Sequence, residues 1–455
     1  MPNIALVGSG GGERAMLGLL GSLVQLKKCD LLDCILYLCG TSGSTWCMAS
    51  LYKEPDWSTH LNAVLKDIME RLGAKVSLQD AWTKLHKYHD EPNFSLTHVW
   101  AVMFVSMIVK EIDENTISNQ KGNHSKDPYP IYTVIDKQYK QKKLNQDAWF
   151  EITPHEAGYS VTGAFVDSAY FGSQFKNGNL IKKQPEIDML YLQGLCGSAL
   201  ADKEKILKWF WEKIRGKWDK PRKEMFVSAQ GLLHERRHDI LKQHTLTIFE
   251  NFEDWFETSE KGASFISILN DIIRLLKTWT WGTTYNFLYK MEEEDVRLSV
   301  LSEEKTYYED AGLLNNSPYF PMLRKERDID LIISLDFSAG DPMETVINTS
   351  EMCRDLKIPF PEVKLPRGVS EPDDFYLFEG ENGAPTVIHI PLFNKVNCDG
   401  HIKEWVKRYR TFQSAYSHDM MIDLIEKAGE NVKNNKARLV TAIREVIEKK
   451  KAKAC

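Results

Sequence analysis

The chain has 455 residues, of which 43% are hydrophobic and 27% are charged, and these fractions are ordinary for a globular protein. Its formal net charge of -6 argues against a general affinity for nucleic acid. No apolar run approaches the roughly 20 residues of a membrane span, and the opening residues lack the basic segment of a signal peptide. The eight scattered cysteines show no metal-ligand spacing and indicate a reducing compartment. We therefore expect a soluble protein without a metal centre.

The first fifty residues have the pattern of an α/β fold. The segment Asn3-Ile-Ala-Leu-Val7 predicts a buried strand, a glycine loop follows at Ser9-Gly-Gly-Gly12, and an apolar helix comes next. The run Cys34-Ile-Leu-Tyr-Leu-Cys39 predicts a second buried strand. It ends in Gly40-Thr-Ser-Gly-Ser44 and is followed by the helix-compatible run Trp46-Cys-Met-Ala-Ser-Leu-Tyr52. This alternation predicts a parallel sheet flanked by helices.

Ser42 is the candidate nucleophile of this region. A serine between glycine-flanked small residues, after a strand and before a helix, has its hydroxyl held clear of the sheet. The fifth position of the turn is Ser44 instead of the glycine of common lipases, so this segment alone fits an ordinary strand-helix turn equally well.

The glycine loop has three possible uses. A dinucleotide site would need a glycine where Glu13 stands, and a nucleotide-phosphate loop would need Gly-Lys-Ser/Thr, which is absent. An oxyanion hole is the third use, and here the second strand does deliver a serine.

The middle of the chain predicts helices and then strands. Residues 57–115 have helical spacing, Tyr129–Ile135 and Ala148–Thr153 predict strands, and 158–178 is expected to be irregular. Residues 202–278 interleave lysines with tryptophans, which fits either a cap helix packed on the domain or a surface lying on a membrane. We expect a single domain, 1–455, in which 202–278 is a cap or lid insertion.

The C-terminal third supplies a strand ending at Asp310, followed by the small residues Ala311 and Gly312. Further elements are predicted at 330–337 (strand), 343–356 (helix), 375–378 and 386–390 (paired strands), and 401–417 and 420–448 (helices).

A nucleophilic serine needs a base. His234, His238 and His389 lie in contexts typical of ordinary surface or core histidines. Asp310 is better placed, because a desolvated carboxylate within hydrogen-bond reach of a serine can act as its base. Asp336, in Leu335-Asp-Phe-Ser338, is a competing carboxylate, and taken alone it is nearly as good.

Several of these segments resemble one family in the same order along nearly the whole chain. Ser9-Gly-Gly-Gly-Glu-Arg14, Gly40-Thr-Ser-Gly-Ser-Thr-Trp46, Tyr308-Glu-Asp-Ala-Gly-Leu313 and Trp281-Gly-Thr-Thr-Tyr-Asn-Phe-Leu288 are similar to segments of the cytosolic (group IV) phospholipase A2 family, most closely its gamma-type branch. The resemblance implies a patatin-like α/β fold, with a mixed, largely parallel sheet flanked by helices and a helical cap over the lipid site.

The resemblance also implies roles for particular residues. Ser42 matches the nucleophile and Asp310 the base of a dyad that forms an acyl-serine intermediate. Gly11 and Gly12 match the oxyanion glycines. The resemblance assigns two arginines, Arg14 and Arg327, to the phosphate of the substrate. It implies no metal and no cofactor.

The expected activity is calcium-independent hydrolysis of the fatty acyl esters of glycerophospholipids at membrane surfaces, with hydrolysis of lysophospholipids and acyl transfer as side activities. The expected location is the cytoplasm and the surface of intracellular membranes, with no nucleic acid and no obligate protein partner. The alternatives are a soluble lysolipid esterase or transacylase with the same dyad, and a non-catalytic lipid-binding protein. Glu13 departs from the family, and Cys455 ends the chain without the three residues that a prenylation signal needs after its cysteine.

Overall fold

The computed structural model describes most of the chain, and the insertion expected at 202–278 lies almost wholly outside the described residues. The structure describes residues 1–142, 147–200, 267–268, 271–272, 274–275, 278–292, 298–364, 371–411 and 416–454.

One sheet organises the fold, with the strand order β12-β13-β11-β1-β2-β3-β4-β5-β6. Its centre is parallel: β1 (Ile4–Gly8) lies between β11 (Leu331–Asp336) and β2 (Tyr37–Gly40), and β13 (Thr386–Pro391) and β3 (Tyr129–Asp136) continue it on either side. This arrangement confirms the predicted mixed, largely parallel sheet.

Antiparallel strands extend the sheet at both ends. They are β4 (Trp149–Ile152), β5 (Glu156–Tyr159) and β6 (Phe165–Asp167) at one end, and β12 (Tyr376–Phe378) at the other. A further strand, β10 (Lys305–Asp310), pairs with both β3 and β9 (Thr283–Tyr285). The strands β7 (Gln174–Lys176) and β8 (Asn179–Lys182) form a separate hairpin.

The expectation of irregular structure at 158–178 is therefore wrong for part of that segment. At Gly158 a side chain would begin 2.1 Å from the Ala164 carbonyl oxygen, so glycine lets the chain of β5 approach the turn that leads into β6. Glycine thus serves strand pairing here, although it usually weakens strands.

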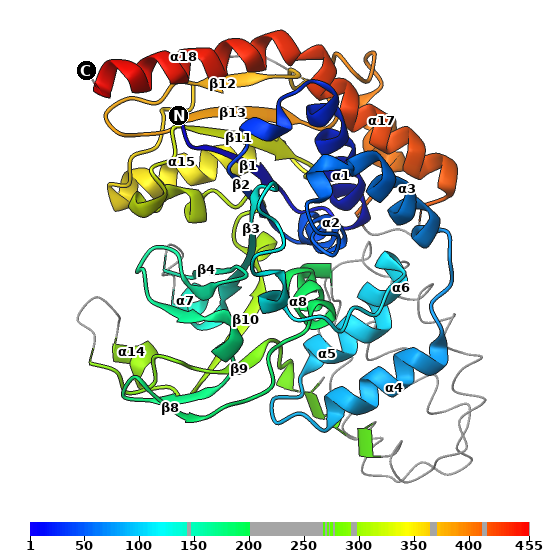
Figure 1. Cartoon of the computed structure of the whole chain (residues 1–455), viewed down its shortest axis with the longest axis vertical. Helices are drawn as coiled ribbons and strands as arrows, with labels where there is room; N and C mark the ends of the chain where they lie inside the picture. Colours follow the sequence, from blue (N-terminus) through cyan, green and yellow to red (C-terminus); the bar gives the residue numbers. More distant parts are fainter. Residues whose placement is uncertain are drawn as a thin grey trace.

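Helices cover both faces of the parallel strands (Figure 1). α1 (Glu13–Lys28) packs on the face that carries Leu6, and α15 (Glu344–Leu356) packs on the opposite face, which carries Val7. Alternate residues of one strand thus serve two layers. α17 (His418–Asn434) lies against α1 so closely that a side chain at Gly21 would begin 2.3 Å from the Ile425 carbonyl oxygen.

Among the described residues, 57–109 are largely helical, as predicted. The further α-helices are α2 (Gly43–Leu51), α3 (Leu61–Leu72), α4 (Leu78–His89), α5 (Leu96–Trp100), α6 (Ser106–Val109), α7 (Lys137–Gln141), α8 (Met189–Cys196), α14 (Leu298–Leu301), α16 (Ile402–Arg408) and α18 (Lys436–Ala454). Of these, α7, α8 and α14 were not predicted. A π-helical turn, Ala101–Val105, joins α5 to α6.

Several element boundaries differ from prediction: the helix expected over 401–417 ends at Arg408, and the last helix continues to Ala454. Two further differences have a clear structural reason. The helix expected over 420–448 is broken at Asn435, which is fully buried and donates hydrogen bonds from Nδ2 to Asp374 Oδ2 (3.0 Å) and Asn431 O (2.9 Å). The strand expected from Cys34 begins only at Tyr37, because Leu32–Cys34 forms a 3₁₀ turn and the Cys34 side chain is exposed.

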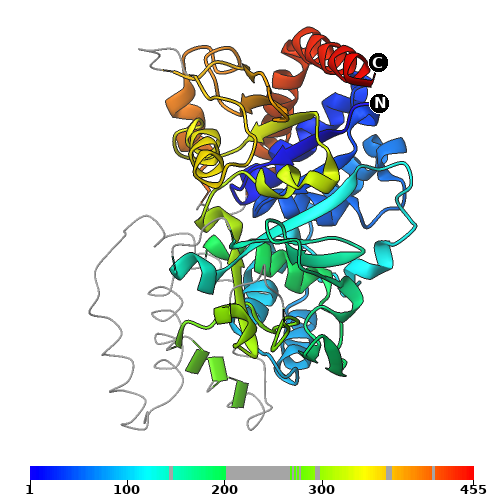
Figure 2. The ribbon, with the colours of Figure 1, turned by 90° about the vertical axis from the view of Figure 1, so that its left-hand side faces the viewer.

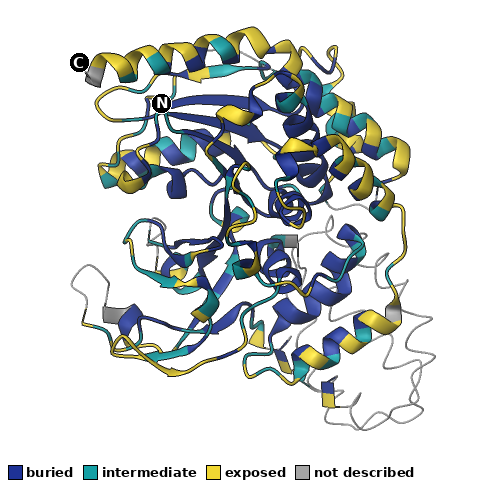
Figure 3. Cartoon of the chain, viewed as in Figure 1, coloured by how far each residue is buried: buried dark blue, intermediate teal, exposed yellow. Residues whose placement is uncertain are grey.

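Burial is concentrated in the sheet and in α1, α2 and α8, whereas α4, α17 and α18 expose their outer faces (Figure 3). The chain ends lie near each other at the α18 side of the molecule, and the second view shows the same arrangement (Figure 2). None of the described helices is long and apolar enough to cross a bilayer.

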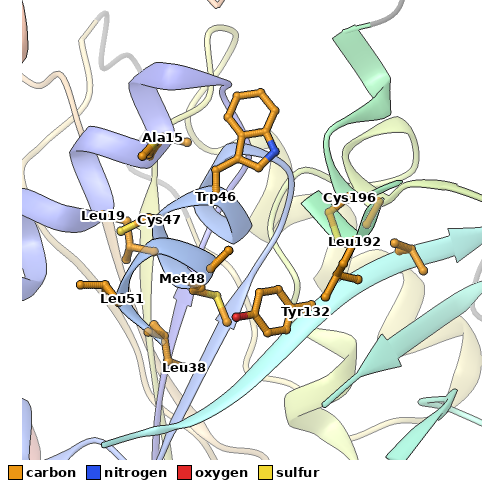
Figure 4. Close-up of a cluster of buried hydrophobic side chains, with 14 of the residues drawn as sticks. Ala15, Leu19, Leu38, Trp46, Cys47, Met48, Leu51, Tyr132, Leu192 and Cys196 are labelled. Carbon is orange, nitrogen blue, oxygen red and sulfur yellow. The ribbon is translucent and has the colours of Figure 1, made fainter. Parts of the chain in front are cut away.

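The helix after the candidate nucleophile is anchored in the core. Trp46, Cys47 and Met48 of α2 lie among buried side chains that include Tyr132 and Cys196 (Figure 4). The Trp46 indole N–H donates to Gln193 O of α8 at 2.9 Å. α2 is therefore held between the sheet and α8, which fixes the position of its first turn.

Candidate active site

Ser42 occupies a strained turn between β2 and α2. Its φ of 51° and ψ of -123° lie outside the regions that non-glycine residues usually adopt, and such a conformation costs about 1–3 kcal/mol. Thr133 of β3 holds the turn, because its hydroxyl donates to Gly40 O at 2.8 Å and also lies 2.9 Å from the Thr41 hydroxyl. Ser42 is consequently presented at the N-terminus of α2, as the nucleophile-turn reading predicts.

Asp310 lies beside Ser42 and is fully buried. It ends β10, and its carboxylate accepts hydrogen bonds from Gly312 N (2.8 Å) and Ala199 N (3.1 Å). Burial raises the pKa of this carboxyl to about 7, although these two hydrogen bonds and the nearby Ser42 side chain act to lower it. The structure thus brings together the two residues predicted as a dyad, and it gives the carboxylate a pKa suited to proton transfer near neutral pH.

The glycine loop between β1 and α1 touches the Ser42 turn backbone to backbone. A side chain at Gly43 would begin 1.9 Å from Gly12 O, and one at Gly10 would begin 2.9 Å from Ser42 Cβ. Gly12 has φ 60° and ψ -138°, a conformation that favours glycine. Among the hydrogen bonds of the described residues, none uses the N–H of Gly11 or of Gly12. These two donors therefore remain available to a ligand at the loop.

Arg14 supports the glycine loop from the protein interior. Its side chain is buried, and it donates from Nε to Phe337 O (2.8 Å) and from Nη1 to Tyr409 O (2.6 Å). The second terminal nitrogen, Nη2, has no hydrogen-bond partner in the described part of the chain and lies 3.0 Å from where a Gly11 side chain would begin. Contact of Arg14 with a substrate phosphate stays a prediction.

Arg327 lies away from Ser42 and the glycine loop. Its guanidinium pairs with Glu151 through Nη1–Oε2 (3.0 Å) and Nη2–Oε1 (2.5 Å), and its carbonyl accepts from Asn3 Nδ2 at 3.0 Å. Asn3 precedes β1, whereas the glycine loop follows β1. Arg327 is thus bound at the amino ends of the parallel strands, and the structure does not group it with Ser42. Its predicted phosphate role remains without a contact that supports it.

The competing carboxylate, Asp336, is bound by other groups. Its Oδ1 accepts from Ser338 N (2.6 Å) and its Oδ2 from the Thr345 hydroxyl (2.9 Å). His389 lies 3.7 Å from Oδ2 and is fully buried, and burial lowers its pKa. Asp310 is therefore the carboxylate that lies beside Ser42.

Three residues near the site were not assigned a role from the sequence. The Ser44 hydroxyl donates to Ser9 O at 2.7 Å, so the irregular fifth residue of the turn holds the glycine loop. Asn316 Nδ2 donates to Gly10 O at 2.9 Å. Glu13 accepts from Tyr416 N at 3.1 Å, and burial raises its pKa to about 7. No periodicity or motif marks such tethers, because each joins segments far apart in the sequence.

Within the described ranges, no group of three or more histidine, cysteine, aspartate and glutamate side chains is arranged to hold a metal ion. The site itself combines a serine, a buried carboxylate beside it, and a neighbouring glycine loop.

Comparison with known families defines the class of the protein. A family model described as the lysophospholipase catalytic domain matches residues 4–355. The class is thus that of enzymes that hydrolyse the acyl esters of phospholipids and lysophospholipids.

Individual relatives narrow this class. Cytosolic phospholipase A2 gamma of Homo sapiens is 35% identical over 98% of this chain and 90% of its own length, and the Mus musculus protein of the same name is 34% identical over 98% and 86%. The solved structure of human GIVD cytosolic phospholipase A2 matches with a TM-score of 0.73 at 24% identity, over 98% of this chain and 63% of that chain, which shows the shared fold. The chain belongs to the cytosolic (group IV) phospholipase A2 family.

Proposed function

We propose that this protein hydrolyses the fatty acyl esters of glycerophospholipids through a Ser42–Asp310 dyad and an acyl-serine intermediate. The observation that carries the proposal is the placement of the Ser42 side chain beside a buried carboxylate whose pKa is about 7. A serine on a strained turn, paired with a base that titrates near neutral pH, has the two properties that an acyl-transfer nucleophile needs.

The proposed reaction has two stages. In the first, Ser42 Oγ attacks the ester carbonyl carbon while Asp310 takes the hydroxyl proton. The oxyanion accepts hydrogen bonds from the N–H groups of Gly11 and Gly12, and its collapse expels the lysophospholipid alkoxide, which takes the proton from Asp310. In the second stage Asp310 takes a proton from a water molecule, whose oxygen attacks the acyl-serine. The bond from the acyl carbon to Ser42 Oγ then breaks, Asp310 returns the proton to Ser42 Oγ, and the fatty acid is released.

Calcium independence is part of the proposal, because the negative charge of the intermediate is met by backbone donors that the fold itself positions. A calcium chelator should leave turnover on phospholipid vesicles unchanged. Strong inhibition by the chelator would contradict this part of the proposal without affecting the dyad.

The substrates are proposed to be phospholipids and lysophospholipids at cytoplasmic membrane surfaces. The description of the matching family as a lysophospholipase catalytic domain supports the second substrate. The unpartnered Nη2 of Arg14 beside the glycine loop supports contact with an anionic oxygen of the substrate. For Arg327, a phosphate role would require release from Glu151.

The test replaces Ser42 by alanine and measures fatty acid release from vesicles together with labelling by a fluorophosphonate probe. Ser42→Ala should lose both, while Ser50→Ala, in the same helix, should keep both. A matched melting temperature for the two variants would exclude unfolding as the cause. Wild-type turnover by folded Ser42→Ala would refute the proposed mechanism.

A further inference from the structure

Asn316 and Gly10 are joined by two hydrogen bonds. The backbone carbonyl of Asn316 accepts from Gly10 N at 3.0 Å, and the side-chain Nδ2 donates to Gly10 O at 2.9 Å. Because a carbonyl oxygen only accepts, the part of the Asn316 amide that contacts the Gly10 carbonyl oxygen must be its NH₂ group. The two peptide units that flank the Gly10 α-carbon are therefore each held by the same residue.

The direction of one N–H follows from this contact. In a trans peptide the carbonyl of one residue and the N–H of the next point in opposite directions. The bond from Asn316 to Gly10 O therefore turns the Gly11 N–H away from Asn316. Gly10 lies next to Ser42, since a side chain at Gly10 would begin 2.9 Å from Ser42 Cβ. If the peptide rotated, its carbonyl oxygen would point where the N–H now points.

The position of Asn316 suits this purpose, because it lies six residues after Asp310 on the same connection. Its Oδ1 fills the space beside two glycines: a side chain at Gly10 would begin 2.4 Å from this oxygen, and one at Gly312 would begin 3.0 Å from it. The Nδ2 group also donates to the Ser338 hydroxyl at 2.7 Å, which fixes the rotation of the amide. One segment thus carries the proposed base and holds the glycine loop.

We infer that Asn316 is a positioning residue of the reaction, which sets the direction of the Gly11 N–H through its hydrogen bond to the Gly10 carbonyl. The inference rests on the proposed function, in which that N–H binds the oxyanion. Asn316 acts through the loop and makes no contact with the reacting atoms. Its loss should therefore weaken binding of the tetrahedral intermediate and leave binding of the unreacted ester intact.

The experiment compares Asn316→Ala and Asn316→Asp with the wild-type full chain on phospholipid vesicles. Aspartate keeps the shape but places an acceptor against Gly10 O, so it should be the worse of the two. Removing one oxyanion donor costs enzymes about 10²–10³ in kcat, and misdirecting one should cost about 10- to 100-fold with KM within about twofold of wild type.

A second readout separates positioning from substrate binding. A lipid trifluoromethyl ketone forms a tetrahedral adduct with a serine, whereas the matching ether lipid does not react. The trifluoromethyl ketone should lose affinity for Asn316→Ala by about the same factor as kcat/KM, and the ether lipid should bind as it does to the wild type.

Asn315→Ala is the matched control. Asn315 lies in the same segment, and its Nδ2 donates to Ser317 O, Thr345 O and the Thr349 hydroxyl. None of these three partners belongs to the glycine loop. This variant should melt at a lower temperature and keep its kcat. Equal losses of kcat in the Asn315 and Asn316 variants, or equal losses of affinity for the ketone and the ether, would overturn the inference.

The outcomes also separate this inference from the proposed function. Wild-type kcat in both Asn316 variants, with Ser42→Ala inactive, would overturn the role of Asn316 alone. Turnover by folded Ser42→Ala would instead overturn the proposed function on which the inference depends.

Discussion

Replacing Asp310 by asparagine tests both the chemistry of this carboxyl and its effect on folding. In the native protein burial raises its pKa from 3.8 to about 7. Between these two values the native state binds more protons than the unfolded state, so the free energy of unfolding falls as the pH rises and becomes constant above pH 7. Each pH unit is worth about 1.4 kcal/mol, so the full span of about 3 units corresponds to about 4 kcal/mol.

Asparagine carries no charge at any of these pH values. Its amide nitrogen would meet one of the two backbone donors, Gly312 N or Ala199 N, at a cost of about 1–3 kcal/mol that does not change with pH. The quantity to measure is therefore the difference in unfolding free energy between Asp310→Asn and the wild type. From pH 5 to pH 8 this difference should move in favour of the variant by about 3 kcal/mol. The change arises over the roughly 2 pH units between pH 5 and the native pKa of about 7, at about 1.4 kcal/mol per unit.

The assay is denaturant unfolding at pH 5 and pH 8, followed by tryptophan fluorescence, alongside fatty acid release from vesicles. Activity of Asp310→Asn should fall by about 10²–10⁴-fold, the usual contribution of a general base. Glu13→Gln is the matched control, because burial also raises the pKa of Glu13 to about 7. It should show a similar pH-dependent gain in stability and keep most of its turnover.

A pH-independent stability difference between Asp310→Asn and the wild type would refute the reasoning, because it would mean that the native carboxyl titrates like that of the unfolded chain. Retained activity in a folded Asp310→Asn would separately refute its role as base.

Three further predictions concern the same structure. The wild-type kcat/KM should rise with pH through a pKa near 7, because Asp310 must lose its proton before it can accept one from serine; a flat profile from pH 5 to 8 would count against it. Gly43→Ala should lose activity and melt at a lower temperature than wild type, since the new methyl group would begin 1.9 Å from Gly12 O, and an unchanged melting curve would show that the two loops separate easily. Arg327→Met should destabilise the protein by about 1–3 kcal/mol, because the buried Glu151 loses its two-point partner and keeps only Arg324 (2.9 Å) and the Ser160 hydroxyl (2.9 Å). The double change with Glu151→Met should restore part of that stability; a raised KM in the double variant would instead support a phosphate role.

The parts of the fold predicted correctly are those with strong local patterns. β1, β3 and β11 are short apolar runs bounded by polar or glycine residues, and α1 and α15 have helical spacing. The boundaries that were missed depend on distant partners. α17 ends just before Asn435, whose side chain donates a hydrogen bond to Asp374. No local feature of Lys433-Asn-Asn-Lys436 predicts that contact.

The candidate site shows the same division. Ser42 and the glycine loop could be found from their strand-turn-helix context, and Asp310 from its position at a strand end and from the family resemblance. The residue pattern alone left Asp310 and Asp336 nearly equal, because the two differ in which distant segments they approach, and the family resemblance selected Asp310. Arg327 could not be placed either, since its partner Glu151 is 176 residues away along the chain.

The three buried thiols around the site give experimental access to its motions. Cys39 lies in β2, Cys47 lies in α2 and Cys196 ends α8, and burial raises the pKa of each above the ordinary value of 9.0. A buried, protonated thiol reacts with a disulfide reagent only during a transient opening of the surrounding structure. The labelling rate at each cysteine therefore reports how often one wall of the site opens. Cys34, which is exposed, supplies the rate expected without such protection.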